Sequence, residues 1–537
     1  MVPSMLTAAL FGGLSHIFYF HRGEHHLLGT TYIQLFCTLS AATVAALHVA
    51  REAAWAEALA TVAQHSASYL VGVYGSLLVY RLLLHPLGKF PGPWPARVSS
   101  AWLAFQIKNN NRHYKLLELH EKYGPYVRIG SSDLSVINPK AIDIIQGRCV
   151  KTGWYDHSHP DKSLETSRDM SVHQQRRRIW STAFGSKQLR GYEQRIRKYR
   201  KTLVDRLAGM NSQPVDASKW FSMYSFDVMG DLTFGAGFES LERGEDHWAI
   251  RLLIGTLVFA GAGFPMWLFR LLAAIPGLKG DFWKFLEYSE MRLVERMKNK
   301  PDIPDISDSL LAPLKGKTTT TTEEQLWLRG DARLVIVAGS DTTSATLTGI
   351  FYELAQHPEE VRKLRAELAP YVDENEPRGE FRDSKISHLE HLNGVINEGL
   401  RLYPAVPSSL PRETPPEGVQ VDGVYIPGST SVVCPMFVMG RSELSYQKPL
   451  EFIPERWYQQ PELIRDRSAF APFTVGAYNC IGKPLALLNL RTTVARLVMS
   501  FDVEFAPGFE VESFGQQSKD MFTMHLGALD VIFRPRG

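Results

Sequence analysis

The chain has 537 residues, of which 45% are hydrophobic and 11% aromatic, and a formal net charge of +3. This composition suits one large domain or two to three ordinary ones and excludes a disordered chain, and the balanced charge predicts no nucleic-acid partner. The four cysteines are too few and too unevenly spaced for a disulfide framework or paired zinc ligands, which indicates a reducing compartment for the main domain.

The N-terminal region contains three apolar stretches, at residues 3–20, 27–50 and 68–84. The middle stretch is long enough to cross a hydrocarbon layer of ~30 Å, and the outer two lie near the lower length limit. Residues 2–20 contain no Lys or Arg, so we expect retained anchors and not a cleaved leader. Residues 1–84 are therefore predicted to be a membrane anchor with one to three spans. The HRGEHH sequence between the first two stretches is interpreted as a polar loop, in preference to a metal-binding tract.

A proline-rich segment, residues 85–95, follows the anchor and predicts a hinge before a large domain over residues 96–537. Strands alternate at 126–130 and 134–137, a hairpin signal. A long helical region is expected from about 170 to 400, broken by the polar loop 315–324, where Thr321 and Glu324 fit a capping box. Strand signals return over 421–434, and a last helix starts just after Cys480. The predicted fold class is mostly α with minor β.

Cys480 lies in the glycine-rich sequence FTVGAYNCIG, between Phe473 and an apolar helix. A thiolate ligand of a metal needs backbone that approaches closely and donates N–H groups to sulfur, which Gly476 and Gly482 allow. The helix start beside it is expected to lower the thiol pKa. The alternative is an ordinary free cysteine in a turn.

Glu398 and Arg401 lie three residues apart on a predicted helix, where they share one face. The spacing alone carries little weight, because surface pairs of this kind contribute little. It recurs in three further pairs, Glu165/Arg168, Glu359/Arg362 and Glu462/Arg465. The apolar setting of Glu398, with Arg456 downstream in PERW, predicts a buried Glu–Arg–Arg cluster that fixes the loop carrying Cys480.

The sequence AGSDTT, residues 338–343, places small and polar residues in the middle of an apolar helix. Burying them without partners is costly, Gly339 weakens a helix, and hydroxyls that bond back to carbonyls can bend it. The functional interpretation is a helix opened over a cofactor, with Asp341 and Thr342 handling protons. The alternative is a polar stripe packed on another polar element.

Together these motifs, in this order and with the YGPYVRIG and PERW elements, resemble the cytochrome P-450 family over about residues 85–537. The eukaryotic microsomal type, and its fungal branch, is most similar because of the anchor and the CIGKPLA ending. The resemblance implies a triangular helical prism with a small sheet region behind a transmembrane anchor.

Carried onto this sequence, the resemblance makes Cys480 the axial thiolate of haem b, with Phe473 beside it in the cysteine loop. It makes Asp341 and Thr342 the acid–alcohol pair that delivers protons. Contacts to the haem propionates are implied for His173, Arg177 and Arg412, and a structural triad for Glu398, Arg401 and Arg456.

Two positions depart from the family pattern. Tyr478 replaces a basic residue, so one propionate contact is weakened or becomes a phenol hydrogen bond. His173 replaces a tryptophan, and an ordinary surface position beside an arginine run is the alternative interpretation for it.

The function implied is insertion of one oxygen atom from O2 into an apolar organic molecule, by hydroxylation or epoxidation, in fungal secondary metabolism. No nucleotide-binding glycine motif is present, so electrons are expected from NADPH–cytochrome P-450 reductase, with cytochrome b5 as a further candidate partner. The expected location is the endoplasmic reticulum membrane, with the large domain facing the cytosol because Arg81, Lys89 and Arg97 follow the third stretch.

Two other functions share part of this pattern. One is a haem-thiolate isomerase or dehydratase that needs no external electrons, and the other is a non-catalytic haem-binding membrane protein. By analogy the substrate pocket draws on the loop before His173 and on residues 264–267, 335–338, 405–410 and 521–522, which are apolar on balance. The residues leave the substrate open among terpenoid, polyketide, fatty-acid and indole skeletons.

Overall fold

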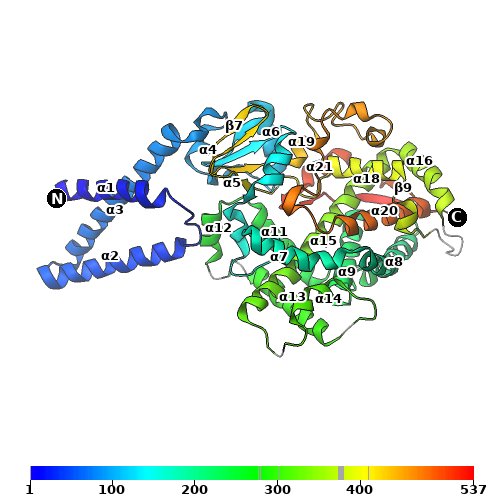
Figure 1. Ribbon diagram of the computed structural model, residues 1–537, viewed down its shortest axis with the longest axis horizontal. Helices are drawn as coiled ribbons and strands as arrows, with labels where there is room; N and C mark the ends of the chain where they lie inside the picture. Colours follow the sequence, from blue (N-terminus) through cyan, green and yellow to red (C-terminus); the bar gives the residue numbers. More distant parts are fainter. Residues whose placement is uncertain are drawn as a thin grey trace. The chain divides into compact units, whose positions relative to one another are not determined.

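The chain divides into two compact units in a computed structural model, and each is described here by itself (Figure 1). The first unit holds residues 1–106, 127–134 and 263–279, and the second holds the remainder. The structure describes residues 2–275, 277–278, 280–299, 301–317, 319–372, 380–408 and 410–536.

The first unit is built on apolar helices, three of which lie at the N-terminus. These are α1 (Val2–Ser15), α2 (Gly29–Arg51), α3 (Trp55–Val79) and, from later in the chain, α12 (Met266–Ala273). Helices α1 and α3 cross closely, because a Cβ on Gly12 or on Gly72 would lie only 2.1 Å and 1.8 Å from carbonyl oxygens of the facing helix. Glycines allow this approach of two backbones, as they do between membrane helices.

Two of these helices are long and apolar enough to cross a membrane. They are α2, with 23 residues, and the 30-residue stretch Trp55–Leu84, which joins α3 to a π-helical turn at Tyr80–Leu84. The second begins at Trp55 and not at residue 68 as expected, since the helix break falls just before it, where Glu52 has a φ of 52°. The apolar helices fit a membrane anchor.

The proline segment after the anchor is packed within the first unit. It forms a 3₁₀ turn at Pro86–Lys89 and leads into α4 (Trp94–Val98). The predicted hairpin is confirmed as β1 (Tyr126–Arg128) and β2 (Asp133–Val136), in which the Ile129 N–H donates to the Asp133 carbonyl at 3.0 Å. The Arg128 N–H in turn donates to the Pro91 carbonyl at 2.8 Å, so strand and proline segment hold each other.

The second unit is mostly helical. Its longer helices are α6 (Arg112–Tyr123), α7 (Met170–Ser181), α8 (Ser186–Gly209), α9 (Ala217–Phe234), α11 (Trp248–Gly261), α13 (Gly280–Lys298), α15 (Thr322–Gln356), α16 (Pro358–Leu368), α18 (Glu390–Leu402) and α20 (Lys483–Ser500). Its shorter helices are α10 (Ser240–Arg243), α14 (Ile306–Leu310), α17 (Asp383–Ile386), α19 (Met436–Gly440) and α21 (Val511–Gln517). Helix α5 (Ala101–Gln106) belongs to the first unit. The predicted helical region from about 170 to 400 is thereby confirmed.

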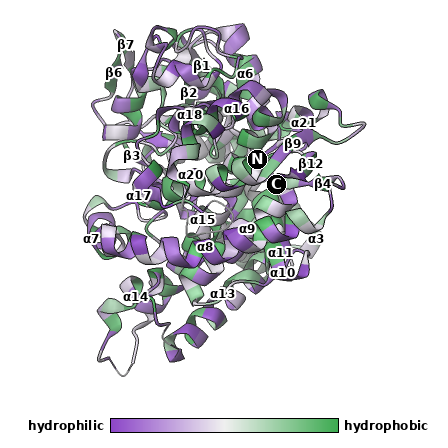
Figure 2. Ribbon diagram, turned by 90° about the vertical axis from the view of Figure 1, so that its right-hand side faces the viewer, coloured by the Kyte–Doolittle hydropathy of each residue, from purple (hydrophilic) through white to green (hydrophobic). Residues whose placement is uncertain are grey.

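Helix α15 forms the centre of this unit. It begins at the predicted capping box, in which the Thr321 hydroxyl and the Glu324 carboxylate cap each other's backbone N–H groups. It is apolar enough to cross a membrane, yet most of it is buried against α9, α13, α18 and α20, so it is a core helix (Figure 1). The surface is polar by contrast, as the largely hydrophilic α7 in Figure 2 illustrates.

The strands of the second unit are short. In one sheet β5 (Arg412–Glu413) pairs antiparallel with β3 (Val150–Lys151) and β8 (Ser431–Val433), a register that sets Lys151 opposite Arg412. Further strands are β4 (Val215–Asp216), β6 (Val419–Val421), β7 (Val424–Ile426), β9 (Phe501–Phe505), β10 (Lys519–Met521), β11 (Thr523–His525) and β12 (Asp530–Pro535). They pair as β4–β12–β9, β6–β7 and β10–β11. The mostly α fold with minor β is confirmed.

Candidate functional site

The loop that carries Cys480 is closed by its own backbone. The Cys480 N–H donates to the Phe473 carbonyl at 2.9 Å, and α20 starts three residues later, at Lys483. Gly476 is required here, because its φ is +74° and a Cβ would lie 2.5 Å from the Gly147 carbonyl oxygen. A glycine is not required at position 482, because a Cβ there would lie 3.8 Å from the Cys480 Sγ, an ordinary contact distance.

The Cys480 thiol is accessible, while Cys149 and Cys434 are buried. Burial among the surrounding atoms raises the pKa of the Cys480 thiol above its usual value. The N–H groups of Gly482 and Lys483 and the charges of Arg177 and Lys483 act to lower that pKa, but they are outweighed. The helix start therefore acts in the expected direction, but desolvation of the sulfur is the larger effect.

Four predicted cofactor-binding side chains gather next to this loop. The rings of His173 and Tyr478 lie 4.7 Å apart in an edge-to-face arrangement, and the Arg412 guanidinium lies 5.1 Å from the centre of the Tyr478 ring. Arg177 donates to the Asn479 carbonyl at 2.8 Å and also to the Asn479 side chain.

Three buried polar atoms in this group have no hydrogen-bond partner: His173 Nδ1, Arg412 Nε and the Tyr478 hydroxyl. Burying such atoms without a partner is costly, so their convergence calls for an acceptor from outside the protein. These donors suit two carboxylates, because guanidinium, imidazole and phenol groups all donate hydrogen bonds to carboxylate oxygen. The residues present therefore fit the propionates of a haem.

Lys151 belongs to this cluster, although no pattern in the sequence pointed to it. Its Nζ lies 4.6 Å from the centre of the Tyr478 ring and donates to the carbonyls of Leu164, Glu165 and Ser167 at 3.1, 2.6 and 3.0 Å. Burial lowers the pKa of Lys151 to about 7, despite the opposing charge of Glu165. Position 478 holds no basic residue, but two basic side chains, Lys151 and Arg412, lie beside Tyr478. They are opposite each other on the paired strands β3 and β5.

Tyr478→Phe is expected to weaken haem retention. A hydrogen bond to a charged group contributes about 1.5–3 kcal/mol, which corresponds to roughly 10–100-fold in affinity. Transfer of haem from the purified protein to an excess of apomyoglobin measures this. Tyr446→Phe is the matched control, since it removes another buried hydroxyl without a partner, beside the Glu398 cluster. An equal rate of haem loss in both variants would show that the Tyr478 hydroxyl makes no propionate contact.

The Glu398 side chain binds both arginines and is fully buried with them. Arg401 forms two hydrogen bonds to it, at 2.9 and 2.7 Å, and the Arg456 Nε donates to Glu398 Oε1 at 3.0 Å. The Ile453 N–H and the Trp457 indole complete the set at 3.0 and 2.9 Å.

This cluster holds a neighbouring segment and not the cysteine loop itself. Arg401 donates to the carbonyls of Gly440, Pro449 and Glu451, and Arg456 to those of Gln447, Lys448 and Leu463. The link to the loop is indirect, through the Trp457 ring, which packs 4.3 Å from Phe470. The other pairs with the same spacing use different partners: Glu165 meets Arg333, Arg168 meets Asp156, Glu359 meets His357 and Arg465 meets Glu443.

Helix α15 is continuous through AGSDTT, so the predicted opening of the helix was wrong. The hydroxyls do bond back to the helix, Thr342 to the Ala338 carbonyl at 2.7 Å and Thr343 to the Gly339 carbonyl at 3.0 Å. Gly339 serves packing instead, because a Cβ there would lie 2.4 Å from the end of Met229 on α9. In the fully described stretch from Gly330 to Ala355, Ala338 alone is exposed, which leaves one accessible spot on a buried helix a turn before Thr342.

Asp341 is buried and is held by two residues that sequence analysis missed. Its Oδ2 accepts a hydrogen bond from the Thr523 hydroxyl at 2.6 Å and lies 3.2 Å from His525 Nε2. Burial acts to raise the pKa of Asp341, but the His525 charge and both hydrogen bonds lower it below its usual value. The pairing joins residues more than 180 positions apart, so no local pattern could have indicated it.

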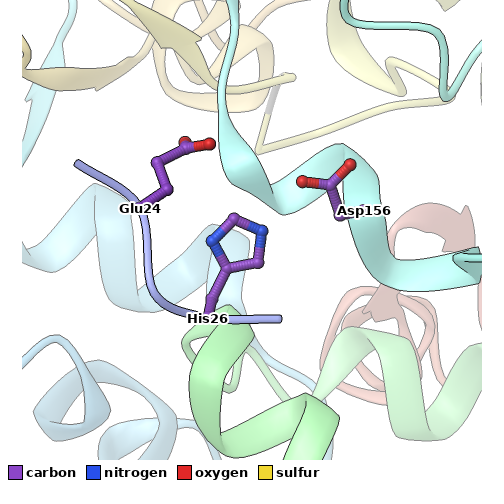
Figure 3. Close-up of side chains that lie close together, drawn as sticks. All are labelled: Glu24, His26 and Asp156. Carbon is purple, nitrogen blue, oxygen red and sulfur yellow. The ribbon is translucent and has the colours of Figure 1, made fainter. Parts of the chain in front are cut away.

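Glu24 and His26 in HRGEHH belong to the first unit, and Asp156 belongs to the second (Figure 3). These three side chains therefore define no site within either unit. Likewise, the predicted pocket residues 264–267 lie in the first unit, while 335–338 and 521–522 lie in the second.

A model of the cytochrome P450 family matches residues 91–533. The chain is 46% identical to cytochrome P450 monooxygenase notG' of Aspergillus versicolor, over 99% of this chain and 98% of that protein. It is 45% identical to tryprostatin B 6-hydroxylase of Aspergillus fumigatus, over 100% and 98%. Monooxygenase sthD of Phaeosphaeria nodorum is 42% identical, over 87% and 99%.

The chain therefore belongs to the cytochrome P450 family. It is a haem-dependent monooxygenase of the fungal type found in secondary metabolism, which acts on an organic substrate and takes electrons from a redox partner. The isomerase and the non-catalytic hypotheses give way to this conclusion.

Proposed function

We propose that Cys480 binds the iron of haem b as its thiolate ligand and that His173, Arg177, Arg412 and Tyr478 hold the propionates. The observation that carries this proposal is the set of buried donors without partners beside the cysteine loop. When bound, the haem iron supplies the centre at which dioxygen is activated. Phe473 contributes the carbonyl that fixes the Cys480 backbone and packs at the edge of the main core.

Asp341 and Thr342 hold and move protons in this proposal. Thr342 lies beside the accessible spot at Ala338, and its hydroxyl bonds to the Ala338 carbonyl, from which it can turn to another acceptor. Asp341 is buried and carries a negative charge at neutral pH, because its partners lower its pKa. A carboxylate next to a hydroxyl on one helix turn is a short route for a proton into a space that water reaches poorly.

Thr342→Ala is expected to keep the haem and to divert reducing equivalents into hydrogen peroxide. General acid–base groups contribute on the order of 10²–10⁴-fold, so product formed per NADPH should fall about tenfold or more. Peroxide and product are measured against NADPH consumed. Thr343→Ala is the matched control, because it removes a hydroxyl with the same type of back-bond one residue further along. Asp341→Asn should behave as Thr342→Ala does; wild-type product per NADPH in either variant would refute the assigned role.

The electrons come from NADPH–cytochrome P450 reductase, with cytochrome b5 as a second donor. Residues 1–84 anchor the protein in the endoplasmic reticulum membrane, 85–95 form the connection, and 96–537 are the catalytic domain on the cytosolic side. Two apolar helices of sufficient length and the basic residues after them support this arrangement. Protease treatment of sealed microsomes should release the catalytic domain without detergent, and protection of that domain would reverse the orientation.

The substrate is a secondary metabolite of the tryprostatin type, which the enzyme hydroxylates. Two relatives named tryprostatin B 6-hydroxylase, at 45% and 43% identity over nearly the whole chain, support this class. Phe522, one of the predicted pocket residues, stacks its ring on that of Trp154, with the ring centres 5.3 Å apart. Such faces suit a flat, aromatic skeleton.

The deciding experiment uses the full-length protein in membranes with its reductase. Carbon monoxide added to the reduced protein should give the red-shifted Soret band of a thiolate ligand. Tryprostatin B with NADPH and reductase should gain one oxygen atom. Product formed without NADPH or reductase would exclude the monooxygenase reaction, and a normal spectrum without conversion of tryprostatin B would exclude this substrate alone.

A further inference from the structure

The carboxylate of Asp341 is fixed by the hairpin near the C-terminus, formed by β10 and β11. Thr523 and His525 on β11 both reach its Oδ2, at 2.6 and 3.2 Å. Successive side chains of a strand point to opposite faces, so residues two apart share a face. The alternation explains why Thr523 and His525 both reach Asp341, while Met524 between them packs with Phe437 and with Ala345, four residues further along α15.

The hairpin is held firmly enough to define where His525 lies. The Met524 N–H donates to the Ala405 carbonyl at 2.9 Å, and the Asp520 N–H donates to the Asn110 carbonyl at 2.7 Å. Phe522 forms the tip with a φ of +78°, a backbone conformation that bulky residues rarely adopt, and the Asp520 carboxylate accepts its N–H at 3.2 Å. The strain indicates that the surrounding contacts determine this turn.

The two ends of the Asp341–His525 pair differ in their access to water. The Asp341 side chain is 6% exposed and that of His525 is 23% exposed. The imidazole is therefore the more accessible member of the pair. A histidine can carry an additional proton, and with it a positive charge, near neutral pH, which a second carboxylate in its place could not do.

The charges around the pair favour a protonated histidine. Burial acts to lower the pKa of His525, but the charge of Asp341 and their hydrogen bond raise it above its ordinary value of 6.5. The positive charge of Lys519, which pairs with His525 from β10, lowers the pKa of His525, but by less than Asp341 raises it. With its folded pKa raised, His525 keeps its proton to higher pH than a free imidazole and loses it as the pH rises through the folded value.

We propose that His525 is a positioning residue for proton delivery: it orients the Asp341 carboxylate and replaces, from solvent, the proton that Asp341 passes on. This inference rests on the proposed role of Asp341. The protonated imidazole gives its Nε2 proton to Asp341 Oδ2 and keeps the proton on Nδ1, and it returns to the protonated form when Nε2 takes up a proton from solvent water. Thr523 keeps the carboxylate in register through its hydroxyl but carries no charge.

The test compares His525→Gln with wild type in the holoenzyme, using full-length protein, reductase, NADPH and tryprostatin B as the probe. Glutamine keeps an N–H donor but cannot be protonated near neutral pH. The readout is hydrogen peroxide formed per NADPH oxidised, from pH 6 to pH 9, in a preparation whose wild-type enzyme converts tryprostatin B. We expect the wild-type ratio to rise with pH as His525 loses its proton, and His525→Gln to show a high, flat ratio. At pH 6 the difference should be about tenfold, part of the ~10²–10⁴-fold typical of acid–base groups.

His357→Gln is the matched control. His357 also faces carboxylates, Glu353 at 3.5 Å and Glu359 at 3.1 Å, and they raise its pKa as Asp341 does for His525, but it lies at the end of α15. This variant should keep the wild-type ratio and its pH profile. A merely structural role for His525 would lower thermal stability in its glutamine variant and leave the peroxide ratio per folded enzyme unchanged.

The outcomes separate this inference from the proposed function. A wild-type ratio that does not change between pH 6 and pH 9 overturns the inference without any variant, even if His525→Gln fails to fold. A His525→Gln profile equal to that of wild type overturns it as well. Loss of the red-shifted carbon monoxide band in the wild type would instead overturn the proposed function.

Discussion

Replacing Cys480 with alanine is expected to abolish the red-shifted Soret band of the reduced protein with carbon monoxide, together with all NADPH-dependent product. A thiolate is the source of that spectral shift, and the neighbouring side chains of the loop, Tyr478, Asn479 and Ile481, offer no sulfur in its place. Without the ligand the propionate contacts alone remain, so the holoprotein fraction should fall as well. Difference spectra and haem content per polypeptide measure both effects.

Cys149→Ala is the control for this experiment. Cys149 is a second cysteine of the same unit and is buried, with a pKa that burial raises to about 11. Its replacement removes one sulfur from the core, which costs about 1 kcal/mol of stability, and should leave the spectrum intact. A red-shifted band that survives in Cys480→Ala and disappears in Cys149→Ala would mean that the ligand is misassigned.

The features that local sequence could predict are those that depend on residues close together in the chain. The capping box at Thr321, the hairpin after Tyr126 and the glycine at position 476 all follow from requirements met within a few residues. The combination of motifs also indicated the family, which residues 91–533 match. Length and polarity alone were less informative: they predicted an apolar stretch that starts at residue 68, whereas α3 begins at Trp55.

Contacts between residues that are far apart in the chain could not be predicted from the sequence. Lys151 lies beside Arg412 and Tyr478 through the register of two two-residue strands, and His525 reaches Asp341 from 184 residues further along the chain. The role of Gly339 also depends on a distant residue. Met229 on α9 occupies the space that a side chain at position 339 would need, so the glycine permits a close contact between two helices and does not break α15. Net electrostatics were also hidden, because the desolvation of Cys480 depends on the whole surrounding structure.

Among the four Glu-x-x-Arg pairs, the one at Glu398 should be by far the most sensitive to substitution. Removing one partner of a buried ion pair typically costs about 3–5 kcal/mol, because it leaves a charge without compensation. Here two guanidinium groups would lose their common carboxylate, and the Ile453 N–H and the Trp457 indole would lose an acceptor. Since domains are stable by only about 5–15 kcal/mol, Glu398→Ala should accumulate little folded protein.

Glu462→Gln tests whether position or spacing matters, because Glu462 has the same spacing to Arg465 but lies on the surface. Surface substitutions usually change stability by within about 0.5 kcal/mol, so this variant should unfold as wild type does. Urea unfolding of the detergent-solubilised proteins, followed by tryptophan fluorescence, measures the difference. Glu398→Gln should fall between the two, because the amide keeps an acceptor for one guanidinium but supplies no charge for either. If Glu398→Gln and Glu462→Gln unfolded at the same urea concentration, the buried cluster would owe its stability to shape and hydrogen bonding, and the charge on Glu398 would contribute nothing.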